Sequence, residues 1–176
     1  MEHNLTVAPA VIGAMAAAGI FTLVLPLALG IFFWKRAQGR WRFFFLGGAV
    51  FVLFAMVLEQ MGHTLLLYGA LGRVLQGNLW LYALYAGLMA GVFEECGRWL
   101  AFKLTGRWSR GAGDALMYGA GHGGTEAVLL AGMTMVNNII ISMLLNQGGL
   151  EAVEGVLGPI PEAGMAAIQG MVAAPA

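Results

Sequence analysis

Apolar positions form long runs in this chain, and the lysines and arginines gather mainly in the short segments between them. Such runs occupy residues 11–34, 43–67, 79–104 and 114–145. Each is long enough to cross a hydrocarbon core of ~30 Å as a helix. Because the runs do not alternate with polar positions, they argue against a β-barrel. The pattern therefore predicts an all-α fold, a multi-pass transmembrane helical bundle of about four to five membrane helices.

The composition supports the same class of protein. Hydrophobic residues make up 60% of the 176 positions and charged residues 10%, whereas a soluble domain carries about 25% charged residues. The formal net charge is zero, so bulk charge points to no nucleic acid. We expect the lipid bilayer to be a partner of the chain.

Lysine and arginine residues mark the topology. Lys35, Arg36, Arg40 and Arg42 directly follow the first apolar run, and a second basic group at 103–110 follows the third. The positive-inside rule places both groups in the cytoplasm. This arrangement predicts an N-terminus outside the membrane.

The last apolar run is too long for one simple crossing. As a single helix it would extend ~45 Å, against a bilayer core of ~30 Å. The run either breaks, near Gly132 or Asn137-Asn138, or projects beyond the membrane, and the sequence leaves both open. Residues 147–176 are punctuated by glycine and proline and carry glutamates without a lysine or arginine. We therefore expect a bundle over 1–146 and a shortened tail over 147–176, outside the membrane.

Two polar motifs interrupt the apolar runs. The first is Glu94-Glu95-Cys96-Gly97-Arg98, and the second is Gly121-His122-Gly123-Gly124-Thr125-Glu126. An ionisable side chain inside a membrane costs about 2.5–3.5 kcal/mol on insertion scales. Such groups should therefore face one another, water or a ligand. We interpret the two motifs as the two halves of one functional site.

Counting along the helices places both motifs at one depth. Glu94 and Glu95 lie ~12–13 Å from the cytoplasmic end of their helix, and His122 lies ~12 Å from the start of the next. Arg98 can reach either glutamate at a spacing of three or four residues. His122 and Glu126 are four apart and share one face. We predict that His122 lies within ~8 Å of one glutamate and that Arg98 contacts the other.

These residue types suit hydrolysis. A glutamate can take a proton from water, while a histidine orients that water or stabilises the oxyanion. Alternatively, His122, Glu126 and Glu94 are candidate ligands of a divalent metal such as zinc, whose bound water would be the nucleophile. The sequence does not uniquely supply the three protein ligands that zinc usually needs. Whether a metal takes part stays open at this point.

Other interpretations compete with hydrolysis. The same residues could relay protons in a proton-coupled transporter component, or belong to a catalytically inactive module that binds membrane partners. Glu94, Glu95 and Arg98 could also form a purely structural ion network. Glu59 and His63 share a helix face and could support the site or lie at the outer interface. Asp114 is most simply a helix N-cap.

At these residues the sequence resembles a known family. The Phe-Glu-Glu-Cys-Gly-Arg run, Lys103 and the Ala-Leu-Met-Tyr-Gly-Ala-Gly-His-Gly-Gly-Thr-Glu-Ala run are similar to the YhfC family of bacterial intramembrane metalloproteases. The motifs are more distantly similar to CAAX-processing and bacteriocin-processing membrane proteases and to PrsW-type proteases. The resemblance spans roughly residues 34–149.

The resemblance implies an enzyme. It implies an intramembrane endopeptidase of the bacterial inner membrane that hydrolyses a peptide bond of a membrane-associated peptide or protein. It implies Glu94 and Glu95 as catalytic or metal-binding carboxylates, Arg98 as their partner, and His122 with Glu126 as the second half. Those families continue into further membrane helices with a third polar motif, so we expect this chain to be a fragment or a shortened member.

Overall fold

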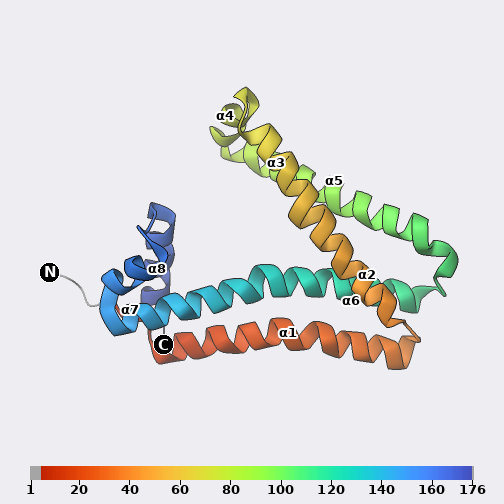
Figure 1. The fold of residues 1–176 in the computed structure, drawn as a ribbon, viewed down its shortest axis with the longest axis horizontal. Coiled ribbons are helices and arrows are strands. Elements are labelled where there is room, and N and C mark those ends of the chain that lie inside the picture. Colours follow the sequence, from red (N-terminus) through yellow and green to blue (C-terminus); the bar gives the residue numbers. More distant parts are fainter. Residues whose placement is uncertain (1–4, 176) are drawn as a thin grey trace. The chain divides into compact units, whose positions relative to one another are not determined.

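The structure is a computed structural model that describes residues 5–175, apart from the side chain of Ala70. The sequence predicts that residues 1–4 lie outside the membrane, but these residues are beyond the described part of the chain. The described residues form helices and contain no strand. In chain order the elements are α1 (Pro9–Ala37), α2 (Trp41–Phe51), η1 (Val52–Glu59), α3 (Gln60–Leu67), α4 (Ala70–Gln76), α5 (Leu79–Thr105), η2 (Gly106–Trp108), α6 (Ala112–Glu126), η3 (Ala127–Gly132), α7 (Met133–Leu157) and α8 (Glu162–Ala173) (Figure 1).

Three helical stretches are long and apolar enough to cross a membrane: Pro9–Ala37, Trp41–Leu67 and Ala112–Leu157. The predicted class, an all-α protein of the membrane type, is thereby confirmed. Helix α5 has a comparable length of 27 residues, but its C-terminal half carries the charged first motif. That α5 also crosses the membrane stays a prediction.

The chain divides into two compact units, and the first comprises residues 5–24 and 127–175 of the described chain. Its core consists of buried residues from α1, α7 and α8 and the segment before α1. They are Val7, Met15, Leu145, Val153 and Ile168. The side chain of Asn146 accepts a hydrogen bond from Val7 N at 2.8 Å and donates one to Val7 O at 2.9 Å. These two hydrogen bonds hold the segment before α1 against α7.

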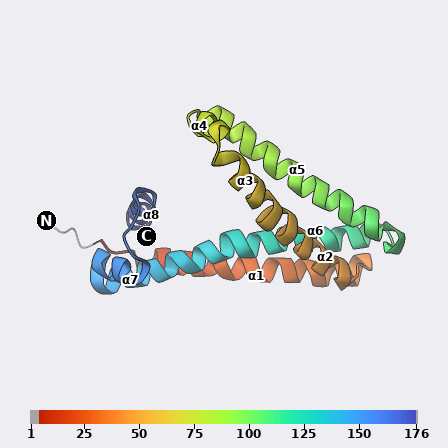
Figure 2. The ribbon, with the colours of Figure 1, turned by 45° about the horizontal axis from the view of Figure 1, so that its top comes forward.

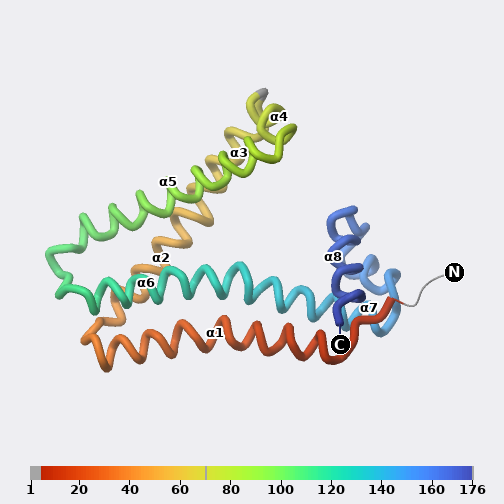
Figure 3. The backbone as a smooth tube through the Cα atoms, turned by 180° about the vertical axis from the view of Figure 1, so that it is seen from behind, coloured from red at the N-terminus to blue at the C-terminus, as the bar shows by residue number. Residues whose placement is uncertain are grey.

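The second unit comprises residues 25–126. Figures 2 and 3 show α2, η1 and α3 following one another as one continuous helical rod, after which α4 turns the chain and α5 leads back. Helix α5 packs along η1 and α2, and α6 packs on α2. The core between them contains Phe43, Val50, Ala101, Met117 and Tyr118. Helix α5 begins where the Asn78 side chain accepts hydrogen bonds from the next backbone N–H groups, as an N-cap does.

The long last run does not break where the sequence analysis placed a possible break. Gly132 ends the π-helical segment η3, and the helix continues as α7 through Asn137 and Asn138. The backbone leaves helical geometry further on, at Gly148 and Gly149, where Gly149 has a φ of 67°. Glycine adopts this left-handed conformation at little steric cost. The two glycines therefore interrupt the helix, whereas the two asparagines continue it.

Candidate functional site

The two adjacent glutamates of α5 point in different directions. Glu95 pairs with Arg98, whose Nη1 lies 3.0 Å from its carboxylate. This pair is on an exposed face, because the side chains of Arg98 and Glu95 are 46% and 65% exposed. Glu94 is half-buried and diverges from its neighbour by the ~100° that separates consecutive helical residues. The predicted contact between Arg98 and one of the two glutamates is confirmed.

Glu94 instead faces His122 of α6. The Nε2 atom of His122 lies 3.8 Å from a carboxylate oxygen of Glu94, well inside the predicted limit of ~8 Å. The separation is slightly longer than a hydrogen bond. Catalytic pairs are often loose before substrate binds. The structure thus brings together the two motifs at the level expected from counting.

His122 is buried, with 6% of its surface exposed. Its ring packs edge-on against Phe51 at 5.4 Å between centroids and is stacked with Tyr118 at 5.8 Å. Within the described chain, neither ring nitrogen has a hydrogen-bond partner. A buried polar atom without a partner is uncommon and marks a place where water, an ion or a reacting group can bind. His122 therefore has both a carboxylate neighbour and unused hydrogen-bonding capacity.

Helix α2 determines how the two motifs meet. It packs against both α5 and α6, the two helices that carry the motifs. A Cβ atom added at Gly121 would lie 1.8 Å from Phe44 O, and one added at Gly47 would lie 2.1 Å from Tyr118 O. These glycines let the backbones of α2 and α6 approach closely. Phe51, which packs against His122, was missed because it belongs to this intervening helix.

The glycines around His122 have two roles. Gly121 and Gly124 are used for close packing, against Phe44 O and against Pro26 of α1, respectively. A Cβ atom added at Gly119 or Gly123 would meet nothing within 4 Å. The glycines therefore allow close helix packing on one side of α6 and leave an open surface on the other. Tyr118 was also missed, although its spacing of four residues from His122 was a signal.

The candidate metal ligands do not form a complete set. Glu126 is half-buried one turn beyond His122 and has no ion-pair partner among residues 5–175. No group of three or more His, Cys, Asp or Glu side chains in the described chain could hold a metal ion. Glu94 and His122 would supply two ligands, and zinc sites use three or four. The described residues therefore do not fit a self-sufficient metal site.

A second polar cluster lies between η1, α3 and α5. Glu59 is 8% exposed, and its carboxylate lies 3.3 Å from Nε2 of His63. Nδ1 of His63 lies 2.8 Å from the hydroxyl of Tyr85. The predicted position of Glu59 and His63 on one helix face is confirmed. Tyr85 was not predicted because its approach depends on the packing of α5 against α3.

Asp114 has a different role from the simple N-cap that the sequence suggested. It lies inside the first turn of α6, is 1% exposed, and accepts hydrogen bonds from N and Nε of Arg40 at 3.1 and 3.0 Å. Arg110 N also donates to Asp114, at 2.7 Å. The hydrogen bond with Asp114 raises the pKa of the Arg40 guanidinium above its ordinary value. Asp114 thus connects the loop before α2 to the loop before α6.

The fold and the site together define an all-α membrane protein in which a buried histidine faces a glutamate. The sequence model of the YhfC intramembrane metalloprotease family matches residues 21–174. The chain is 34% identical over 139 residues to a protein of Bacillus subtilis (strain 168) described as "uncharacterized membrane protein YhfC". The alignment covers 78% of this chain and 54% of that relative, so the chain spans about half the length of the curated relative it matches.

The chain belongs to the YhfC intramembrane metalloprotease family. No solved structure matches it.

Proposed function

We propose that this chain is an intramembrane endopeptidase that hydrolyses a peptide bond of a membrane-associated substrate, with Glu94 and His122 as the reacting pair. The observation that carries the proposal is the buried imidazole of His122, whose nitrogens lack hydrogen-bond partners in the described chain and whose Nε2 faces Glu94 at 3.8 Å. Structural ion pairs are normally satisfied. This histidine retains the capacity to bind a water molecule or a substrate carbonyl.

In the proposed reaction, Glu94 accepts a proton from a water molecule as that water attacks the scissile carbonyl carbon. His122, whose Nε2 lies 3.8 Å from the Glu94 carboxylate, donates a hydrogen bond to the oxyanion that develops on the carbonyl oxygen. When the carbon–nitrogen bond breaks, the proton held by Glu94 passes to the departing amine. One proton of the water thus ends on the amine product, the hydroxyl group ends on the acid product, and Glu94 returns to its ionised form.

The family description supports a metal, which when bound would activate water and polarise the carbonyl. Glu94 and His122 would supply two of the three protein ligands that such a metal usually needs. The described residues contain no group of three such ligands, and the proposed reaction uses Glu94 and His122 alone. Glu126, one turn from His122, is proposed to contribute to the site from the same helix.

Glu95 and Arg98 are proposed to position the reacting carboxylate. Their ion pair lies on the turn that carries Glu94, so it stabilises the helix at that turn. The pair is largely exposed, and exposed ion pairs contribute about 0–1 kcal/mol. Glu95→Gln should therefore reduce the reaction much less than Glu94→Gln does.

The proposal is tested by comparing the peptide termini in membranes of bacterial cells that express the chain or its variants. Termini that require the wild-type chain should disappear with Glu94→Gln, because loss of a general base lowers the rate about 10²–10⁴-fold. They should also disappear with His122→Ala, because loss of an oxyanion donor costs about 10²–10³-fold. Glu154→Gln, an exposed carboxylate of α7, is the matched control and should leave them unchanged. Identical termini from the wild type and both site variants would refute the proposal.

The Glu59–His63–Tyr85 cluster favours a second candidate function, a proton-coupled transporter component. Ionisable side chains that are linked by hydrogen bonds between membrane helices can relay protons. In that case vesicles containing the chain would show pH-driven flux that Glu59→Gln removes, and no cleavage would be detected. Cleavage that persists in Glu59→Gln would favour the endopeptidase.

In either case the proposed location is the bacterial inner membrane, crossed several times, with the N-terminus outside. The two basic loops support this orientation through the positive-inside rule. The division into a bundle over 1–146 and a tail over 147–176 also stays a prediction.

A further inference from the structure

Positive charge is concentrated at one end of the second unit. All of the chain's nine lysines and arginines except Arg73 and Arg98 lie within residues 35–42 and 103–110. The structure joins these segments, because Nη2 of Arg42 donates a hydrogen bond to Trp108 O at 2.7 Å and Arg40 donates to the same oxygen. We call this region the basic end. It consists of Lys35, Arg36, Arg40, Arg42, Lys103, Arg107 and Arg110.

The charge of the basic end is largely uncompensated. Asp114 is the acidic residue nearby, and it is engaged by Arg40. The other members are exposed, and none of them forms an ion pair within residues 5–175. Uncompensated cations in loops next to membrane helices attract anionic headgroups.

Exposed tryptophans surround the same end. Trp34, Trp99 and Trp108 are 52%, 60% and 49% exposed, and tryptophan is enriched where a membrane meets water. The Nζ of Lys103 lies 4.4 Å from the centre of the Trp99 ring. Two of the apolar stretches flank the loop 38–40 directly. The basic end therefore lies at the expected level of the lipid headgroups.

A cavity of about 290 Å³ opens within this end, lined by Arg42, Phe43, Leu46, Thr105 and Trp108. It combines a guanidinium and a hydroxyl with aromatic and aliphatic walls. The guanidinium of Arg42 lies 5.2 Å above the Phe43 ring, which keeps it at the wall. This volume is close to the lower limit of small-molecule sites, about 300 Å³, so the cavity suits a group as small as a phosphate headgroup.

We propose that the cavity between α2 and η2 binds the phosphate headgroup of an anionic phospholipid, with Arg42 as the phosphate ligand. A lipid is favoured over an acidic polypeptide because the other walls are apolar and the surrounding tryptophans are exposed. Basic cavities between membrane helices bind anionic headgroups in this way. The proposal does not depend on the endopeptidase activity.

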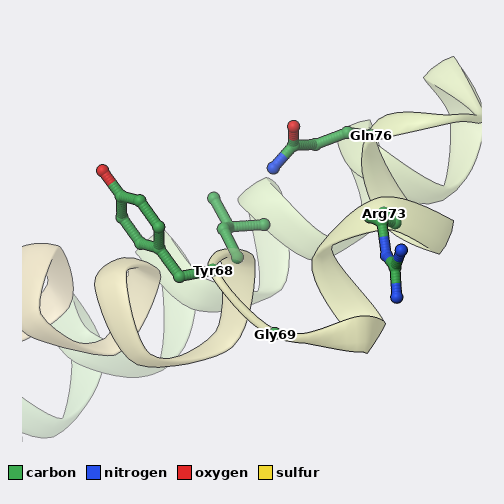
Figure 4. Close-up of a pocket in the computed structure, with 5 residues that line it drawn as sticks. Tyr68, Gly69, Arg73 and Gln76 are labelled. Atoms are coloured by element: carbon green, nitrogen blue, oxygen red, sulfur yellow. The ribbon is translucent and has the colours of Figure 1, made fainter.

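A cavity at the opposite end of the α3–α5 hairpin provides a matched control. It measures about 590 Å³ and is lined by Leu67, Tyr68, Gly69, Arg73 and Gln76. In Figure 4 the Tyr68 ring and the Arg73 guanidinium lie on opposite sides of the view. Arg73 is exposed and has no other cation near it in sequence. Arg73→Gln thus removes an exposed arginine from a cavity outside the basic end.

The experiment measures the association of spin-labelled phosphatidylglycerol and spin-labelled phosphatidylcholine with the full chain in phosphatidylcholine vesicles. The wild type should prefer phosphatidylglycerol. Arg42→Gln should lower that preference about fivefold, the effect of one interfacial cation, whereas Arg42→Lys should retain most of it. Thr105→Phe fills the cavity without removing a cation and should lower the preference as well. Unchanged thermal unfolding shows that each variant has folded.

Equal association of the two lipids with the wild type would overturn the proposal. An equal loss in Arg73→Gln and Arg42→Gln would show a general charge effect and overturn the site. Displacement of phosphatidylglycerol by inorganic phosphate at matched ionic strength would assign the cavity to free phosphate. Displacement by a soluble oligoglutamate peptide would assign it to an acidic polypeptide.

Discussion

The carboxylate of Asp114 is fully buried and holds the guanidinium and the backbone N–H of Arg40, which precedes α2. Arg40 also donates to Trp108 O in the loop after α5. One buried carboxylate therefore fixes three chain segments at the end of the unit that carries the candidate site. Helix α2 packs against both motif-bearing helices. The Arg40–Asp114 pair, which fixes the start of α2, therefore helps to position the helices on which Glu94 and His122 meet.

Asp114→Ala should destabilise the chain by about 3 kcal/mol, as breaking one side of a buried ion pair does. The Arg40 side chain is 23% exposed, so water can partly replace the lost partner. Thermal unfolding in detergent measures the effect. Glu151→Ala, which removes an exposed carboxylate of α7, is the control and should change little. Equal stability of the two variants would contradict the role of Asp114.

Gly121→Ala should destabilise the second unit by about 1–3 kcal/mol, the cost of overpacking a tight contact. The added Cβ would lie 1.8 Å from Phe44 O, which requires α2 and α6 to move apart. Gly123→Ala is the matched control two residues away, where a Cβ meets nothing within 4 Å. It should be neutral or slightly stabilising, because alanine favours a helix more than glycine. Thermal unfolding of the two variants measures the difference. An equal change in stability for both would disprove the close approach of α2 and α6.

Asn146→Ala should lower stability by about 1 kcal/mol through the loss of its hydrogen bonds to Val7, each of which has a modest net value. Proteolysis of the segment before α1 should also become faster, because this segment would lose its tie to α7. Asn137→Ala, an exposed asparagine on the same helix, serves as the control. Unchanged proteolysis in Asn146→Ala would contradict this role.

The topology prediction can be tested by cysteine labelling from outside intact cells, after replacement of the exposed native Cys96 by serine. Lys35→Cys, in the last turn of α1, and Gly106→Cys lie in the two basic segments and should not react with an impermeant reagent. Gly155→Cys lies in the predicted outside tail and should react. Gly106 and Gly155 have room for a side chain, so neither substitution should disturb the fold. Reaction at Lys35→Cys or Gly106→Cys would reverse the orientation.

Helical periodicity explains why part of the candidate site was predictable. The three-residue spacing of Glu95 and Arg98 places them on one face of any helix, and the structure pairs them. The same geometry requires Glu94 to diverge from Glu95. Counting from the helix ends then placed His122 at the level of Glu94, and the two face one another. Their roles in catalysis stay predictions.

Where a long helix ends was not predictable from residue type alone. Gly132 and the two asparagines at 137–138 looked like breaks, yet the helix passes through them and is interrupted at Gly148 and Gly149. A glycine permits a left-handed backbone without requiring it. Neighbouring packing therefore decides which glycine interrupts the helix.

By itself, the sequence determined that the chain is helical and of the membrane type, and which ionisable residues have to find partners. Both follow from the cost of exposing backbone and charge to lipid, which acts on every residue locally. The tertiary structure decided that α2 stands between α5 and α6, that Phe51 covers His122, and that Arg40 joins Asp114. These contacts link residues far apart in the chain, and their geometry depends on how closely the glycine-bearing helices approach.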